Sequence, residues 1–430
     1  MFFLNYIYFA ILTFVGIKYL FSIRVKMKHP LQKGGYMVLD GREAFWVLTF
    51  STGLLAFSAP GALDLMAIRL LVLEILLMTG LFMSGRSPVW SLPLVMYAVF
   101  LGWIIIGCFY TEAPVFGFRV VLKYLYPLIV TLFASAVVRD TEVFLKAGLG
   151  ARQVALLSII VSFMPFVGRL IPGVFWYGTA RAINYISIMI FSLAMYFCAK
   201  NIKQRRKNLF YVILFILPCF LWVFRTSIMG SLIAIMGFFF IKYRLRSMPI
   251  ILGVLIAGVV AVFTIPSLRQ KMFFDDSKSI EEFQSGQISM EDVNTNARAA
   301  MWEFLEDRFY EKNKLIGSGT GSVQNFLYNN IVFGGLKVPH SDFVQMKCDN
   351  GLIGLIIYLV ALLMMFGHCF MRYQTSEDRS LKMCALVAGA STIGVVATLY
   401  SDNVVNYSMA TLSMPFGFYG MMLGISKTKK

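Results

Sequence analysis

The sequence predicts an all-α integral membrane protein that crosses the bilayer about 12 to 13 times. Of its 430 residues, 58% are hydrophobic and only 14% are charged, whereas about a quarter of the residues of a soluble domain carry a charge. Apolar runs of about 20 residues, long enough for a helix to cross the hydrocarbon core, follow one another along the chain. One long polar stretch, residues 266–348, interrupts them.

The candidate spans divide the chain into three parts. We expect about ten spans within residues 1–265, a loop with an amphipathic helix outside the membrane at 266–348, and about three spans within 349–430. The predicted spans are Phe2–Ile23, Ala44–Ala62, Met66–Met83, Pro88–Phe109, Pro114–Val138, Val154–Ile171, Ala182–Ala199, Leu209–Phe224, Thr226–Ile241, Pro249–Ile265, Gly351–Met371, Met383–Leu399 and Tyr407–Ile425.

Short basic clusters between the spans indicate the topology, because cytoplasmic loops carry an excess of lysine and arginine. The clusters alternate with the spans, which puts the long loop on the opposite face, the periplasm or cell exterior. The formal charge of +17 therefore reflects topology and not a nucleic-acid-binding face. The clusters are Arg24, Lys26, Lys28, Lys33 and Arg42; Arg139, Lys146 and Arg152; Lys200, Lys203, Arg205, Arg206 and Lys207; Lys242, Arg244 and Arg246; Arg372, Arg379 and Lys382; and Lys427, Lys429 and Lys430.

Three arginines lie at the predicted outer ends of helices, against this charge bias: Arg169, Arg181 and Arg225. Each could extend its side chain to the headgroup layer. Several on the face that carries the loop instead favour a site for an anionic ligand, because the guanidinium fork matches phosphate oxygens. Arg119 and Lys123, one turn apart on one helix, are further ligand candidates on the same side.

Two charged residues inside the third predicted span, Arg69 and Glu74, are predicted to form an internal structural pair, since isolated charges in a membrane are costly.

The long loop contains several features with possible chemical roles. Residues 294–312 have the apolar spacing of an amphipathic helix whose first turn holds Arg298, where an anion would also meet free backbone N–H groups. Gly317, Gly319 and Gly321 superficially resemble a phosphate-binding loop, but they lack the flanking elements of a nucleotide fold, which favours a tight turn. The Asp275-Asp276 pair and the scattered cysteines do not predict a metal site.

His340 is the histidine expected to face outward, just before the chain re-enters the membrane. An imidazole can accept a proton from an attacking alcohol, which is the role of a general base. A structural role is the alternative for a lone histidine. The outward-facing arginines on the same side of the membrane favour catalysis.

These residues resemble the O-antigen ligase and O-antigen polymerase superfamily of bacterial inner-membrane glycosyltransferases. The resemblance covers mainly residues 178–360. It rests on Arg225-Thr226-Ser227 opening a helix, on Arg298 followed by Trp302 and then Gly317-x-Gly319-x-Gly321, and on His340-Ser341-Asp342-Phe343 followed by Asn350-Gly351-Leu352-Ile353-Gly354-Leu355.

The resemblance implies a metal-independent, cofactor-free and inverting transfer of a glycan from undecaprenyl diphosphate to an acceptor hydroxyl at the periplasmic face. Arg225 and Arg298 match the arginines that hold the lipid diphosphate, and His340 matches the proposed base. Arg181 looks like the family's basic residue at the start of the preceding long span. The family commonly has His-Asn where this chain has His340-Ser341, so the role of that asparagine is open here.

The resemblance further implies a multi-pass protein of the bacterial inner membrane. Its substrate would be an undecaprenyl-diphosphate-linked glycan within membrane lipid, and a chain-length regulator and a flippase of the same pathway are candidate partners. A polymerase, which extends a lipid-linked repeat unit, is favoured over a ligase, which transfers the glycan to lipid A core. A lipid-linked sugar transporter or flippase is the alternative from another class.

Overall fold

The computed structural model describes residues 2–54, 65–162, 164, 179–221, 223–273, 298–333, 336–407 and 411–428, without side-chain placement for residues 2–10, 65–68, 162, 179–181 and 406–407. Nearly all regular structure in these ranges is helical, which confirms the predicted fold class. The helices are α1 (Phe2–Ser22), α2 (Gly41–Thr52), α3 (Leu65–Met83), α4 (Leu92–Gly107), α5 (Pro114–Val137), α6 (Thr141–Ser162), α8 (Thr179–Cys198), α9 (Ile202–Leu221), α10 (Arg225–Tyr243), α11 (Met248–Thr264), α12 (Pro266–Met272), α14 (Arg298–Leu305), α15 (Ser322–Asn329), α16 (Asp342–Thr375), α17 (Arg379–Thr398) and α18 (Ser413–Thr428).

Within the described ranges, five stretches are both long and apolar enough to cross a membrane. Three shorter apolar helices accompany them, at Ile11–Ser22, Leu92–Gly107 and Ala182–Cys198. The long stretches are Pro114–Val137, Thr141–Val161, Arg225–Thr264, Asp342–Thr375 and Arg379–Thr398, of which Arg225–Thr264 comprises α10, a 3-10 turn (Arg244–Ser247) and α11.

Helices α6, α9 and α16 begin well before their predicted spans, α9 at Ile202 instead of Leu209. α6 begins at Thr141 instead of Val154 because its first turns, although polar in composition, are buried within the protein. Arg152 is only 7% exposed there and donates to Oδ1 of Asn208 at 2.8 Å. α16 begins at Asp342 instead of Gly351, and Gly351 interrupts it with a φ of 67°.

One predicted loop is an antiparallel hairpin, β1 (Arg24–Lys28) and β2 (Tyr36–Asp40), in which Arg24 pairs with Asp40. Both strands alternate between exposed and more buried residues, which is the two-residue period of a strand. The basic residues of β1 therefore lie on one face, and the Lys26 amine lies 4.6 Å from the Tyr36 ring centroid. The basic residues of β1 were predicted only as a topology signal, and their two-residue alternation was not predicted.

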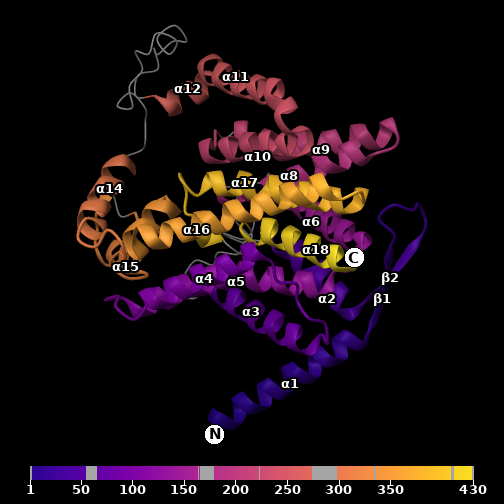
Figure 1. Cartoon of the computed structure of the whole chain (residues 1–430), viewed down its shortest axis with the longest axis horizontal. Helices are drawn as coiled ribbons and strands as arrows, with labels where there is room; N and C mark the ends of the chain where they lie inside the picture. The colour runs from indigo at the N-terminus through magenta and orange to yellow at the C-terminus, as the bar shows by residue number, and fades with distance from the viewer. Residues whose placement is uncertain are drawn as a thin grey trace.

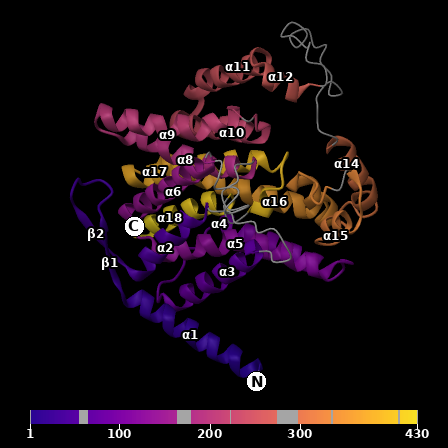
Figure 2. The ribbon, with the colours of Figure 1, turned by 180° about the vertical axis from the view of Figure 1, so that it is seen from behind.

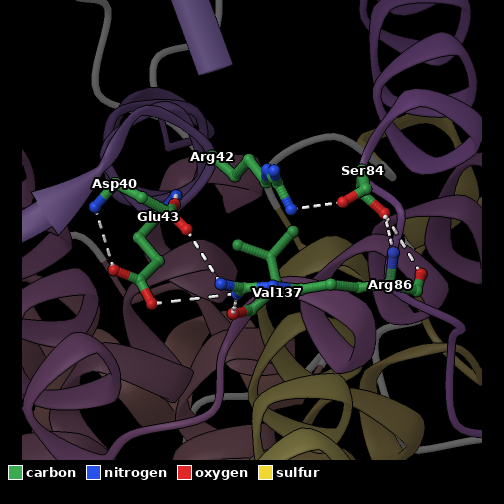
Figure 3. Close-up of polar contacts among 6 residues, drawn as sticks. All are labelled: Asp40, Arg42, Glu43, Ser84, Arg86 and Val137. Atoms are coloured by element: carbon green, nitrogen blue, oxygen red, sulfur yellow. Dashed lines mark hydrogen bonds and ion pairs between the residues drawn. The ribbon is translucent and has the colours of Figure 1, made fainter. Parts of the chain in front are cut away.

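Arg86 ties the hairpin to the helix bundle (Figure 3). Its guanidinium donates to Oδ2 of Asp40 at 2.9 Å and to the carbonyl of Val137 at 3.0 Å. Asp40 is the N-cap of α2 and forms a capping box with Glu43, while Arg42 donates to the carbonyl of Ser84. Burial, and then the charge of Asp40, raise the pKa of Glu43 above its ordinary value.

The basic clusters gather at the end of the bundle that carries the hairpin and the C-terminus, and α14 and α15 lie at the opposite end (Figures 1 and 2). Contacts link several clusters directly. Lys146 donates to the carbonyl of Lys28, and Arg244 donates to Gln374 near the end of α16. A single basic end agrees with the topology predicted from charge. Which side of the membrane it faces stays a prediction.

Close helix packing fixes the positions of α10 and α17. A Cβ on Gly230 of α10 would lie 3.0 Å from the carbonyl oxygen of Gly394 on α17, and one on Gly394 would lie 2.9 Å from that of Gly230. Further along, Gly237 faces Ala390, so the two helices run antiparallel. Small residues allow such close approach in membrane bundles. The start of α10 therefore meets the chain that leaves α17.

Candidate functional site

Four segments meet at the end of the bundle occupied by α14. They are the start of α10, the first turn of α14, residues 339–342 at the start of α16, and the turn at 399–403 after α17. The backbone N–H of Asp342 donates to the carbonyl of Leu399 at 2.9 Å, which joins the last two segments. Residues far apart in the sequence thus form one polar site.

Ser401 is contacted from both helices that carry the arginines, α10 and α14. Nη1 of Arg298 donates to its carbonyl at 2.6 Å, and the hydroxyl of Thr226 contacts the Ser401 hydroxyl at 3.0 Å. Arg225, next to Thr226, donates through Nη1 to the carbonyl of Lys271 at 2.8 Å. The half-buried Arg225 and Arg298 are close enough for their positive charges to repel each other. The structure thus brings together two arginines from helices 73 residues apart in sequence (298 − 225).

α14 is held against the site by a residue one turn after Arg298. The indole Nε1 of Trp302 donates to the carbonyl of Pro339 at 2.7 Å, and its ring meets Tyr400 edge-to-face at 5.6 Å between centroids. The adjacent face of α14 buries Met301 and Leu305 completely. Arg298 and Trp302 therefore lie along the segments that carry His340 and Ser401.

His340 takes a left-handed backbone conformation, with a φ of 53°, which is uncommon for a residue with a side chain. Its Nδ1 lies 3.6 Å from Oδ1 of Asp402, a carboxylate side chain only 5% exposed, while the histidine side chain is 24% exposed. At 3.6 Å the contact is electrostatic and longer than a hydrogen bond. The imidazole therefore turns Nδ1 toward a buried negative charge.

Ser341, where the family commonly has asparagine, is the N-cap of α16. It is fully buried, and its Oγ accepts the backbone N–H of Val344 at 3.2 Å. Serine and asparagine are both strong N-cap residues. The capping contact accounts for a short polar side chain at this position and explains how serine can replace asparagine.

A buried network orders the turn that carries Asp402. The carboxylate of Asp342 accepts from Nδ2 of Asn403 and from the backbone N–H of Val405, each at 3.1 Å. Asn403 also donates to Oε1 of Gln345 at 3.1 Å. The start of α16 thus fixes the turn after α17, and with it the spacing between His340 and Asp402.

The glycine run is a docking turn. Gly317, Gly319 and Gly321 have φ values of 74°, 97° and 89°, which favour glycine. A Cβ at any of the three would lie 2.4–2.6 Å from backbone atoms of another segment. The carboxylate of Asp349 accepts from the backbone N–H groups of Gly321 at 3.1 Å and Val323 at 2.9 Å. The positive φ values and the close approach of the backbone confirm the prediction of a tight turn. The backbone donors of Gly321 and Val323 are bonded to the carboxylate of Asp349 and not to a phosphate.

The remaining predicted ligand residues differ in what the structure shows. Arg119 is exposed, with its guanidinium 5.4 Å from the Phe116 ring, and no contact among the described residues joins it to His340 or Arg298. Arg181 lies in the first turn of α8, where side chains are not described. Arg169 lies outside the described residues, as do Asp275-Asp276 and residues 294–297.

The predicted pairing of Arg69 with Glu74 is wrong. Nη2 of Arg69 donates to the carbonyl of Thr52 at 2.7 Å. Both carboxylate oxygens of Glu74 are buried and have no hydrogen-bond partner within the described part of the chain. Five positions along an α-helix turn through roughly 500°, so the two side chains leave α3 in different directions.

Sequence reasoning missed Ser401, Asp402 and Asp349. A signal for the first two was present, because Ser401-Asp402-Asn403 follows directly after a span predicted to end on the outer side. Polar residues at such a helix end are candidates for the same site as the arginines. The role of Asp349 follows only from the close approach of the glycine turn.

The bundle, with several long apolar helices and a polar site at one end, defines a polytopic membrane protein. Residues 210–359 match the family model described as O-Antigen ligase, so the chain carries a domain of the O-antigen ligase and polymerase family. This match confirms the resemblance. Members of the family are lipid-linked glycan transferases of bacterial membranes. No curated protein matches the chain.

Proposed function

We propose that this protein is a polysaccharide polymerase of the O-antigen type. It transfers a growing glycan from undecaprenyl diphosphate to a lipid-linked repeat unit at the periplasmic face of the inner membrane. The observation that carries the proposal is the convergence of Arg298 and His340 on one turn, residues 400–402, which Thr226, the neighbour of Arg225, also contacts. The family model that matches residues 210–359 describes transferases of lipid-linked glycans.

Arg225 and Arg298 are the proposed diphosphate clamp. Two guanidinium groups that repel each other favour an anion between them, and arginine forks bind phosphate oxygens with charge-assisted hydrogen bonds. Arg225 begins α10, whose helix dipole adds positive potential at its first turn. The clamp neutralises the charge that develops on the diphosphate as the glycosidic bond breaks, which is the task a metal ion performs elsewhere.

His340 is the proposed general base. Its Nδ1 faces the buried carboxylate of Asp402, which leaves Nε2 to accept the proton of the acceptor hydroxyl. As that proton moves to Nε2, the acceptor oxygen bonds to the anomeric carbon, and the bond from this carbon to the diphosphate oxygen breaks. The carboxylate stabilises the imidazolium that forms. A single displacement of this kind inverts the anomeric configuration and needs no cofactor.

The acceptor decides between polymerase and ligase. We favour a repeat unit because the chain departs from the family at the histidine motif, with Ser341 in place of asparagine, and polymerases are the more divergent group. The description of the matched family model supports the ligase as the second candidate. Both use the same donor and the same residues. Arg181, Arg169 and Arg119 stay as secondary proposals for contacts to the glycan or diphosphate.

Purified protein in nanodiscs with undecaprenyl-diphosphate-linked repeat units tests the proposal. Elongation of the units supports a polymerase. Transfer only when lipid A core is supplied supports a ligase, and translocation without new glycosidic bonds would indicate a transporter. His340→Ala should lower turnover by roughly 10²- to 10⁴-fold.

The arginine clamp is tested by Arg225→Ala and Arg298→Ala, which should weaken use of the donor. Lys312→Ala is the matched control, because Lys312 is an exposed cation in the loop that also carries Arg298. Normal donor kinetics in both arginine variants would remove the clamp. Loss of activity on chelation, with rescue by a divalent ion, would contradict the metal-independent mechanism.

A further inference from the structure

A second polar region lies at the opposite end of α16. From Gly351, where the helix is interrupted, the uninterrupted part of α16 runs 21 residues to Arg372 (372 − 351) and spans roughly 32 Å at about 1.5 Å per residue. That length matches the hydrocarbon core of a bilayer, about 30 Å. A ligand at Arg372 is therefore separate from the proposed glycan-transfer site and belongs to the other headgroup layer.

Arg372 lines a groove of about 620 Å³ between the segment before α4 and the last turns of α16 and α18. Its walls are mostly apolar, and several of its hydrophobic residues are exposed at the surface, including Trp90 at 51%, Leu92 at 66% and Met371 at 57%. Arg372 and Lys427 add two positive charges to the lining. The groove thus combines an apolar surface with a cationic rim.

A chain of hydrogen bonds orients Arg372 in this groove. Its Nε donates to Nε2 of His368 at 3.1 Å, and His368 Nδ1 lies 2.6 Å from the hydroxyl of Tyr419, which is 2.9 Å from Oγ of Ser91. Because a guanidinium can only donate, Nε2 must be the acceptor and Nδ1 carries the hydrogen. The first two bonds therefore run in one direction, from Arg372 through His368 to the oxygen of Tyr419, whose hydroxyl group also contacts Ser91.

This orientation leaves the fork of Arg372 available to a ligand. Only Nε takes part in the chain, and no acceptor among the described residues engages Nη1 or Nη2. Lys427 is exposed at the same rim, where its amine donates to Oγ of Ser87 at 2.9 Å. An ammonium has three donors, so the hydroxyl uses one of them.

We propose that this groove binds the headgroup phosphate of an anionic glycerophospholipid, with Arg372 and Lys427 on the phosphate and the acyl chains against Trp90, Leu92 and Met371. Tryptophan is enriched at the membrane interface. Basic pockets between helices at the positively charged end of a membrane protein are suited to anionic lipid headgroups. The apolar walls supply a binding surface that a free phosphate ion cannot use, which favours the lipid over the ion.

Native mass spectrometry of the full chain, with defined lipids added to the detergent, tests the proposal. We expect the wild type to retain phosphatidylglycerol in preference to phosphatidylcholine, and Arg372→Gln to lower that retention about five- to tenfold. Lys427→Gln should lower it about fivefold through loss of one charge, and it leaves the hydrogen-bond chain of His368 intact. Arg379→Gln, an exposed cation at the start of α17 outside the groove lining, is the matched control and should bind like the wild type.

Four outcomes would overturn the proposal. Equal retention of the two lipids by the wild type would show that the groove does not select an anion. An equal loss in Arg379→Gln and Arg372→Gln would assign the effect to general surface charge. Displacement of phosphatidylglycerol by millimolar inorganic phosphate, with phosphate bound in its place, would assign the site to the free ion. Unchanged retention in both Arg372→Gln and Lys427→Gln would place the lipid elsewhere.

Discussion

The Nδ1 atom of His340 lies 3.6 Å from Oδ1 of Asp402, although 62 residues separate them in the sequence (402 − 340). His340 comes just before α16 and Asp402 just after α17, and the two helices form a hairpin whose open end is the site. The backbone bond from Asp342 to Leu399 closes that end. The relationship suggests that the carboxylate orients the imidazole and stabilises its protonated form.

Replacing Asp402 should therefore impair turnover without weakening donor binding. We expect Asp402→Asn to lower kcat about tenfold or more, with the KM for the lipid-linked donor nearly unchanged, because Arg225 and Arg298 remain in place. Steady-state kinetics in nanodiscs measure both constants. A parallel loss of donor binding would instead indicate a structural role for Asp402.

The N-cap role of Ser341 predicts opposite outcomes for two substitutions. Ser341→Asn should keep the cap of α16, and with it the thermal stability and the transfer activity. Ser341→Ala should cost about 1 kcal/mol through loss of the acceptor for the Val344 N–H. Thermal unfolding in detergent compares the two variants. Equal midpoints for Ser341→Ala and the wild type would exclude the cap as the reason for a polar residue here.

The glycine turn predicts a strong effect of a single methyl group. A Cβ at Gly319 would lie 2.6 Å from the Cα of Thr111 on a backbone with a φ of 97°, so Gly319→Ala should destabilise the fold by roughly 1–3 kcal/mol or more. Gly102→Ala, at a helical glycine with open space around it, is the control and should be tolerated. The yield of monodisperse protein and its unfolding midpoint check both.

The raised pKa of Glu43 predicts a pH-dependent stability. Burial raises this pKa first and the charge of Asp40 second, so the folded state disfavours the ionised carboxylate. Its contribution to stability is complete below the unfolded pKa and is lost as the pH rises through the folded pKa. Glu43→Gln can still accept the N–H of Asp40 and should flatten this loss. Unfolding midpoints between pH 4 and 8 compare the two proteins; parallel profiles would show that Glu43 does not contribute.

The all-α membrane fold and most helix positions could be predicted because each span carries its own signal, a run of apolar residues as long as the bilayer is thick. α5 begins at Pro114 as predicted and ends at Val137, one residue before the predicted end. Helix starts with mixed composition were missed. The part of α6 before Val154 is stabilised by burial, with Arg152 bonded to Asn208, and the first turn of α16 is stabilised through Val344 in the small apolar cluster with Met301.

For the site, residue type and the predicted side of the membrane led to Arg225, Arg298 and His340 as candidates, and their roles stay a prediction. The family match supports the resemblance that assigned them roles. Their mutual arrangement could not be predicted, because it depends on contacts between segments that are distant in sequence. The acceptor of the Arg298 hydrogen bond is a carbonyl, that of Ser401, and a backbone group carries no signature of its own in the sequence.

The sequence by itself determined that this chain is a polytopic helical bundle, with basic clusters that share one end and a family motif outside the apolar spans, since hydropathy and charge act locally along the chain. Only the tertiary structure decided that Asp402 faces His340, that Ser341 caps α16, and that Arg69 and Glu74 are not partners. These depend on how antiparallel helices approach one another at positions such as Gly230 and Gly394. Distances of a few ångströms between distant segments follow from packing of the whole bundle.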